Sequence, residues 1–126
     1  MRFMCMVKAC KDYEEGLPPN QELLSGMAKL SAEMMKAGVL LSTDGLQPSS
    51  QGARIRYSDG KRLVTDGPFA ETKELIGGYA IIRAKSKAEA IELVNRVVDV
   101  HIVAGVPEVE IEIRPLFDPP DFNPAK

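Results

Sequence analysis

VTDGPFAETKELIGGY, from Val64 to Tyr79, is the stretch from which the rest of this chain is best interpreted. It connects two predicted strands, and loops between strands are usually short. This one contains a Gly67-Pro68 turn, a polar centre and the pair Gly77-Gly78. Proline fixes its own φ and pushes the preceding residue toward extended geometry. We therefore expect a specialised loop here, and it is the first place to look for a site.

A β-hairpin is predicted immediately before this loop. Arg54–Tyr57 and Arg62–Thr65 are short strand-like runs, and Ser58-Asp59-Gly60-Lys61 joins them. An Asp-Gly pair between two such runs is a strong local hairpin signal. After the loop, Gly78–Arg83 is predicted to be a further strand.

Two helices are indicated by apolar spacing and by capping residues. The first begins after Asn20, a favoured N-cap, and ends before Gly38. Its apolar residues recur at spacings of four, three and four, at Leu23, Met27, Leu30 and Met34. The second follows Ser86, which forms a capping box with Glu89. Its expected buried residues are Ile91, Val94 and Val98.

The remaining segments complete one domain over residues 1–115. Residues 2–9 and Val109–Ile113 alternate as strands, and Val39–Ser42 is a short extended segment. Residues 11–19 are expected to form a loop, and residues 116–126 a Pro-rich C-terminal tail.

The order strand, helix, hairpin, strand, helix, strand predicts an α+β fold. We expect a ferredoxin-like antiparallel sheet with two helices on one face and an extra hairpin. Such a plan leaves the other sheet face bare, and we expect Met4, Met6, Ala80 and Ile82 on it. A contiguous apolar face usually marks an interface. The sequence therefore predicts a homodimer with C2 symmetry that packs sheet against sheet, a dimeric α+β barrel-type assembly.

Composition excludes several function classes. The formal net charge of −2 and the scattered basic residues give no support for nucleic-acid binding. No apolar run reaches the ~20 residues of a membrane helix. Two cysteines, Cys5 and Cys10, and a single histidine predict neither a disulfide framework nor a metal site. Gly77-Gly78 precedes a strand, so no phosphate-binding loop or nucleotide cofactor is expected. Without a targeting signal, a cytoplasmic location is expected.

Two aspartates are the candidate catalytic residues. Asp66 precedes the Gly67-Pro68 turn, which either holds its carboxylate at a pocket mouth or is itself hydrogen-bonded by it. Asp44 also precedes a glycine. If the sheet brings it near Asp66, the pair would raise one carboxyl pKa and supply a general acid or base. The alternative is two independent turn aspartates.

Three further residues are candidates for substrate binding. Lys73 is suited to an anionic group, Thr72 can donate or accept a hydrogen bond, and Tyr79 can present its hydroxyl to a pocket. The alternatives are a solvated loop around Thr72 and Lys73, and a core position for Tyr79. Phe69 is expected to pack the loop onto the body. His101 is expected to be a half-buried packing residue near a helix end.

The long motif resembles the DGPF branch of the YCII-related family, and the resemblance covers most of the chain, from Met1 to about Arg114. It implies the dimeric ferredoxin-like fold already expected. In the classical YCII branch, a His on the first helix and an Asp are thought to form an acid–base pair. Counting back from Gly38, that position holds Met27, which cannot transfer a proton, so the family dyad does not carry over. The resemblance rests on the following segments: Val64–Tyr79, Ala37–Ser42, Asp44–Pro48, Asp59-Gly60 and Glu110–Pro115.

Two hypotheses of function follow. The first is a protein that binds a small organic molecule between the DGPF loop and the sheet, an anionic one if Lys73 contacts it. If it is an acid–base enzyme, the resemblance implies lyase or isomerase chemistry on small ring compounds. The second is a regulatory or protein-interaction module without catalysis, and some DGPF relatives are linked by gene neighbourhood to extracytoplasmic-function sigma factors.

Overall fold

The computed structural model describes residues 1–118, except for the side chain of Lys73. Most of the tail expected after Pro115 therefore lies outside the described residues. The elements in chain order are β1 (Arg2–Lys8), α1 (Lys11–Glu14), α2 (Gln21–Lys36), β2 (Leu40–Gly45), η1 (Ser49–Gln51), β3 (Ala53–Ser58), β4 (Lys61–Asp66), η2 (Thr72–Glu74), β5 (Ile76–Arg83), α3 (Lys87–Val103) and β6 (Ile111–Pro115).

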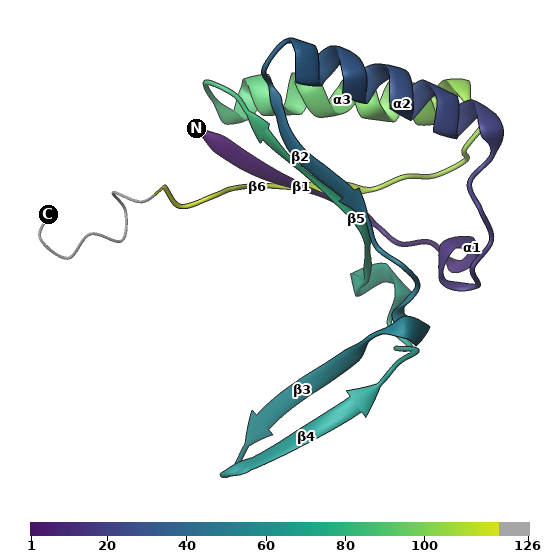
Figure 1. Cartoon of the computed structure of the whole chain (residues 1–126), viewed down its shortest axis with the longest axis vertical. Coiled ribbons are helices and arrows are strands. Elements are labelled where there is room, and N and C mark those ends of the chain that lie inside the picture. The colour runs from purple at the N-terminus through teal and green to yellow at the C-terminus, as the bar shows by residue number, and fades with distance from the viewer. Residues whose placement is uncertain (119–126) are drawn as a thin grey trace, which may run out of the picture.

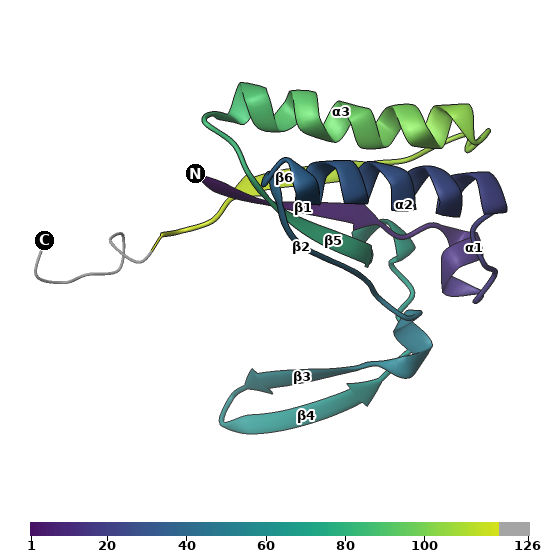
Figure 2. The ribbon, with the colours of Figure 1, turned by 45° about the horizontal axis from the view of Figure 1, so that its top comes forward.

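The main sheet has four antiparallel strands in the order β2-β5-β1-β6. Helices α2 and α3 lie side by side on one of its faces, and no helix of residues 1–118 covers the other (Figure 1; Figure 2). We call this sheet with α2 and α3 the body. Its strand order and one-sided helical layer confirm the predicted ferredoxin-like α+β fold.

Local signals set the ends of both long helices. The Asn20 side-chain oxygen accepts a hydrogen bond from the Leu23 amide at 2.7 Å, and Ser86 Oγ accepts one from the Glu89 amide at 3.2 Å. Gly38 follows the C-cap of α2 with a φ of 76°. The predicted caps are thus confirmed, because each satisfies backbone groups that a helix end leaves without partners.

The core lies between the sheet and the two helices. Phe3 and Ile82 are only 1% and 2% exposed, and they are cross-strand partners on β1 and β5. Leu30 and Met34 of α2 and Val94 of α3 are buried with them. Of the four apolar residues predicted for the first helix, Leu30 and Met34 therefore fill the core, whereas Leu23 and Met27 are half-buried.

The sequence assigned two residues to the wrong face of the sheet. Ile82 pairs with Phe3 and Ala80 pairs with Cys5, and opposite residues in an antiparallel pair share a face. Ala80 and Ile82 therefore face the helices. The prediction failed because the alternation within β5 does not reveal its register against β1. The open face of the sheet, opposite the helices, carries Met4, Met6, Tyr79 and Ile81.

Three smaller predictions also need correction. Residues 11–19 are not all loop, since α1 occupies Lys11–Glu14. Ile91 is 43% exposed, because the buried side of α3 runs through Ala90, Val94 and His101 instead. The last strand begins at Ile111 and not at Val109.

Strands β3 and β4 form a separate two-stranded sheet, which confirms the predicted hairpin. Its turn residues Asp59 and Gly60 have φ values of 52° and 76°, and a two-residue turn with both φ values positive matches the twist of the strands. All the strand residues of this hairpin are exposed. It lies on the side of the sheet opposite α2 and α3 (Figure 1; Figure 2). We call residues 53–66 the arm.

Candidate functional site

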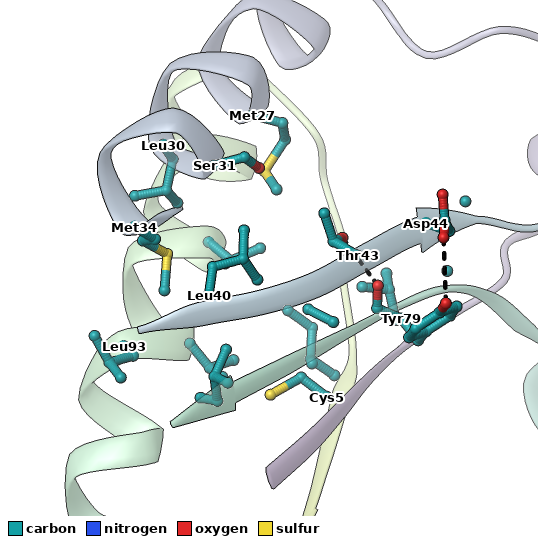
Figure 3. Close-up of a pocket in the computed structure, with 18 residues that line it drawn as sticks. Cys5, Met27, Leu30, Ser31, Met34, Leu40, Thr43, Asp44, Tyr79 and Leu93 are labelled. Atoms are coloured by element: carbon teal, nitrogen blue, oxygen red, sulfur yellow. Dashed lines mark hydrogen bonds between the residues drawn. The ribbon is translucent and has the colours of Figure 1, made fainter. Parts of the chain in front are cut away.

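A cavity of about 460 Å³ lies between the sheet and the helices. This volume falls within the range of small-molecule sites. Its walls are mostly apolar, with Met27 and Ser31 coming from α2 and Thr43 from β2 (Figure 3). The apolar lining also includes Val7, Leu30, Met34, Leu40, Ala80, Leu93, Val97 and Ile111.

Asp44 and Tyr79 border this cavity where β2 ends. They are directly opposite each other on β2 and β5, and the Tyr79 hydroxyl donates to Asp44 Oδ2 at 3.2 Å (Figure 3). Thr43 Oγ1 donates to the Tyr79 carbonyl at 2.9 Å. Tyr79 is also opposite Met6, so the side chains of Asp44 and Tyr79 lie on the open face; they adjoin the cavity only at the end of β2, where Gly45 and Gly78 carry no side chains. The structure thus brings together two of the five residues predicted from the sequence.

The other predicted site residues lie elsewhere. Asp66 ends β4 opposite Ala53, and its exposed carboxylate makes no hydrogen bond or ion pair with the described residues. Thr72 begins the short helix η2 and is half-buried. The backbone of Lys73 lies in the same helix, but its side chain is outside the described part. Neither Asp66 nor Thr72 lines the cavity that Asp44 borders.

The Asp66-Gly67-Pro68-Phe69 turn fixes the base of the arm. The Gly67 amide donates to the Gly52 carbonyl at 2.9 Å, and a methyl group built on Gly67 would lie 1.8 Å from the Ser49 carbonyl oxygen. Only glycine fits such a contact. The peptide bond between Gly67 and Pro68 is cis.

Ser49 connects this turn to α1. Its backbone amide donates to Glu14 Oε1 at 2.9 Å, and its hydroxyl hydrogen-bonds Glu14 Oε2. The Phe69 amide donates to Ser49 Oγ at 3.0 Å. The Arg54 guanidinium lies 3.8 Å from the centre of the Phe69 ring, a cation–π contact. We call these contacts among Glu14, Ser49, Gly67 and Phe69 the clasp.

The Gly77-Gly78 pair allows close approach on both sides of β5. The ladder between β1 and β5 shifts register here, where Val7 pairs with Gly78 and Lys8 with Ile76. A methyl group on Gly77 would contact the Tyr13 ring at 3.5 Å, and one on Gly78 would lie 3.2 Å from the Asp44 carbonyl oxygen. Burial raises the pKa of Tyr13.

A second cavity of about 730 Å³ lies at the other end of the helices, beyond β1. His101 lines it, is 9% exposed, and donates from Nδ1 to the Val97 carbonyl at 2.8 Å. This is the packing role predicted for His101. Within residues 1–118, no group of three or more His, Cys, Asp and Glu side chains is placed to hold a metal ion.

Sequence reasoning missed the residues whose role depends on long-range packing. Ser31 and Thr43 contribute hydroxyls to the first cavity, and Glu14 and Ser49 hold the arm. Thr43 directly precedes the candidate Asp44, but the predicted extended segment ended at Ser42, whereas β2 continues to Gly45. Glu14 and Ser49 had no signal in the sequence, since they are 35 residues apart in the chain.

The sheet order, the one-sided helical layer and the cavity beneath it define an α+β protein of the ferredoxin-like class. None of the helices within residues 1–118 has the length and apolar composition needed to cross a bilayer. The model of the YCII-related domain matches residues 1–113, so the chain belongs to the YCII-related family. It is also similar to an uncharacterised protein, R00369, of Rhizobium meliloti (strain 1021). The two are 30% identical over 97 residues, which cover 77% of this chain and 75% of that protein.

Proposed function

We propose that this protein binds a small organic molecule in the 460 Å³ cavity between α2 and the sheet. The observation that supports this most is the composition of the cavity wall, which is apolar along its length and polar at one end. Small-molecule sites typically combine an apolar lining with a few placed polar groups. The ligand would place an apolar body, such as a ring, beside Met27, Leu30 and Met34.

The polar end selects the type of polar group on the ligand. Ser31 and Thr43 contribute hydroxyls to the wall, and the Asp44 carboxylate lies at its border, on the open-face side of the end of β2. A carboxylate accepts hydrogen bonds and repels anions. We therefore propose a neutral or cationic donor at this end of the ligand, and not the anionic group that Lys73 suggested.

Binding is supported better than acid–base catalysis. Met27, at the position of the family's helix histidine, lines the cavity with a thioether that cannot transfer a proton. Burial raises the pKa of the Cys5 thiol in the wall to about 11, so this thiol stays neutral. The remaining acid–base groups in the wall are Asp44 and the Tyr79 phenol bonded to it.

We also propose the DGPF branch and a homodimer. The branch is supported by the motif Asp66–Phe69, whose glycine is required by the clasp. The dimer is supported by the open face, where Met4, Met6 and Ile81 form an apolar strip that no helix covers. A second copy seated sheet to sheet would remove this strip from water.

The methionines allow a direct test of the binding site. With ¹³C-methyl-labelled methionine, the protein is titrated with benzylamine, benzyl alcohol and benzoate, which share one ring and differ in charge. Benzylamine and benzyl alcohol are expected to shift the methyl signals of Met27 and Met34, which line the cavity. The neighbouring Met35 is 52% exposed and serves as an internal control. Equal shifts at Met35, or no shift at Met27 and Met34 with any of the three compounds, would contradict the proposal.

A matched pair of variants and one single variant sharpen this test. Ser31→Leu should fill the cavity and abolish the shifts, whereas Ala32→Leu, on the exposed side of the same helix, should preserve them. Asp44→Asn should remove the preference for benzylamine over benzoate while leaving the melting temperature nearly unchanged. A preference that survives in Asp44→Asn would show that the polar end lies elsewhere.

A further inference from the structure

The arm has the pattern of a hairpin with one buried face. Ile55 pairs with Val64 and Tyr57 pairs with Arg62, so Ile55, Tyr57 and Val64 share one face, and Arg62 lies at its edge near the turn. Arg54 and Arg56 alternate with them and lie on the other face. Such alternation is typical of antiparallel strands that pack on one side and are solvated on the other.

Among residues 1–118, this apolar face has nothing to pack against. Ile55, Tyr57 and Val64 are 75%, 72% and 62% exposed. The two strands pair only with each other, and an isolated two-stranded hairpin is marginally stable in water. A contiguous exposed apolar surface on an ordered element points to an interface.

The clasp gives this exposed element a fixed base. Ser49 is hydrogen-bonded to Glu14 and to the Phe69 amide. Its carbonyl oxygen lies against Gly67, which directly follows the arm. The arm consequently extends on the same side as the open face (Figure 1; Figure 2). The arm would therefore lie close to any molecule that covers the open face.

The distribution of formal charge favours a second copy of this chain as the molecule that covers the open face. The arm contains four basic residues, Arg54, Arg56, Lys61 and Arg62, and two acidic ones, Asp59 and Asp66, a formal net charge of +2. The whole chain carries −2, so the rest of the chain carries −4. A basic arm and an acidic remainder attract each other between copies, and such complementarity speeds and orients association.

We propose that the apolar face of the arm, formed by Ile55, Tyr57 and Val64, packs against the body of a second copy of this chain. In a C2-symmetric dimer the arm of each copy would contact the body of the other, since a C2 interface uses the same residues twice. The inference extends the proposed homodimer, because it adds the arm to the interface of the open face.

Two adjacent residues of β4 provide a matched test. Leu63 and Val64 are each 62% exposed and point to opposite faces of the arm. Val64→Asp is expected to weaken dimerisation about tenfold or more, whereas Leu63→Asp is expected to change it far less. The dissociation constants of the full-length chains are measured by sedimentation velocity over a dilution series, with circular dichroism to confirm that both variants fold.

The outcomes separate this inference from the proposed dimer. A wild-type chain that stays monomeric at every concentration would overturn both. A wild-type dimer that Val64→Asp and Leu63→Asp affect equally, or not at all, would overturn the role of the arm alone. A selective effect of Val64→Asp would support it.

Photo-crosslinking identifies what the arm contacts. p-Benzoylphenylalanine at position 57, on the apolar face, is expected to give a covalent dimer of the purified chain after irradiation. The same group at position 56, on the opposite face, is the control. Crosslinks only within one chain, or equal dimer yields from the two positions, would overturn the proposal.

Discussion

The body and the arm have the same strand pattern but differ in what covers their apolar faces. In the body, Ile82 of β5 is 2% exposed because the helices pack over it. In the arm, Ile55 of β3 is 75% exposed, although it belongs to an equally regular antiparallel pair. The comparison shows that alternation specifies which face of a strand can be buried and not which molecule buries it.

The sharpest way to break this comparison is to make the same change in both regions. Ile82→Ala is expected to lower the free energy of unfolding by ~2–5 kcal/mol, because it removes buried methyl groups and leaves a cavity. Ile55→Ala should cost ~0.5 kcal/mol or less in the monomer, since its side chain is already in water. Urea denaturation of both variants and the wild type measures the difference.

Protein concentration tells apart the two possible environments of Ile55. If the arm contributes to a dimer, the cost of Ile55→Ala should grow with protein concentration, because association stabilises the folded chain by mass action. The cost of Ile82→Ala should remain large at every concentration. Equal costs for the two variants at high dilution would contradict the contrast between body and arm.

A smaller effect is expected at the junction of the two regions. Gly67→Ala forces a methyl group against the Ser49 carbonyl oxygen, and overpacking of this kind costs ~1–3 kcal/mol. Gly52→Ala is the matched control, because its methyl group would lie 3.6 Å from the same oxygen, an ordinary contact. Hydrogen exchange should show lost protection in β3 and β4 for Gly67→Ala only, with β1 and β5 unchanged. Similar exchange in the two variants would show that the clasp does not support the arm.

The smallest effect should come from the surface of the body. Arg96 of α3 and Glu33 of α2 form an ion pair at 3.0 Å, and both side chains are about half exposed. Exposed pairs contribute little, so Glu33→Gln should lower the free energy of unfolding by ~1 kcal/mol or less. Glu92→Gln, which removes an exposed charge on α3 that has no ion pair within residues 1–118, is the control in the same urea experiment. A loss as large as that of Ile82→Ala would show that surface charge, and not burial, holds the helices together.

Local signals predicted the fold well. Asn20, Gly38 and Ser86 marked helix ends correctly, and Asp59-Gly60 marked the hairpin, because each acts through neighbouring backbone groups. The face of Ala80 and Ile82 was wrong because it depends on the register of β5 against β1. A single strand does not contain that information.

The candidate site was predicted less completely. Tyr79 was identified in a predicted strand and Asp44 as a turn residue before a glycine, whereas β2 continues through Asp44 and its register with β5 pairs the two. Asp66 attracted attention through its glycine and proline neighbours, which turned out to serve the clasp. Motifs rich in Gly and Pro report backbone geometry first, and chemistry only where a cavity lies beside them.

The attachment of the arm has a consequence for the topology of this chain. The Leu46 amide donates to the Gly77 carbonyl at 2.9 Å, so the chain leaves the main sheet after β2 and returns to it at β5 at adjoining points. Residues 46–75 therefore form a single elaborated connection between neighbouring antiparallel strands. An insertion of this type can lengthen, shorten or change its surface without altering the strand order of the sheet. The body and its appendage can consequently diverge at different rates during evolution.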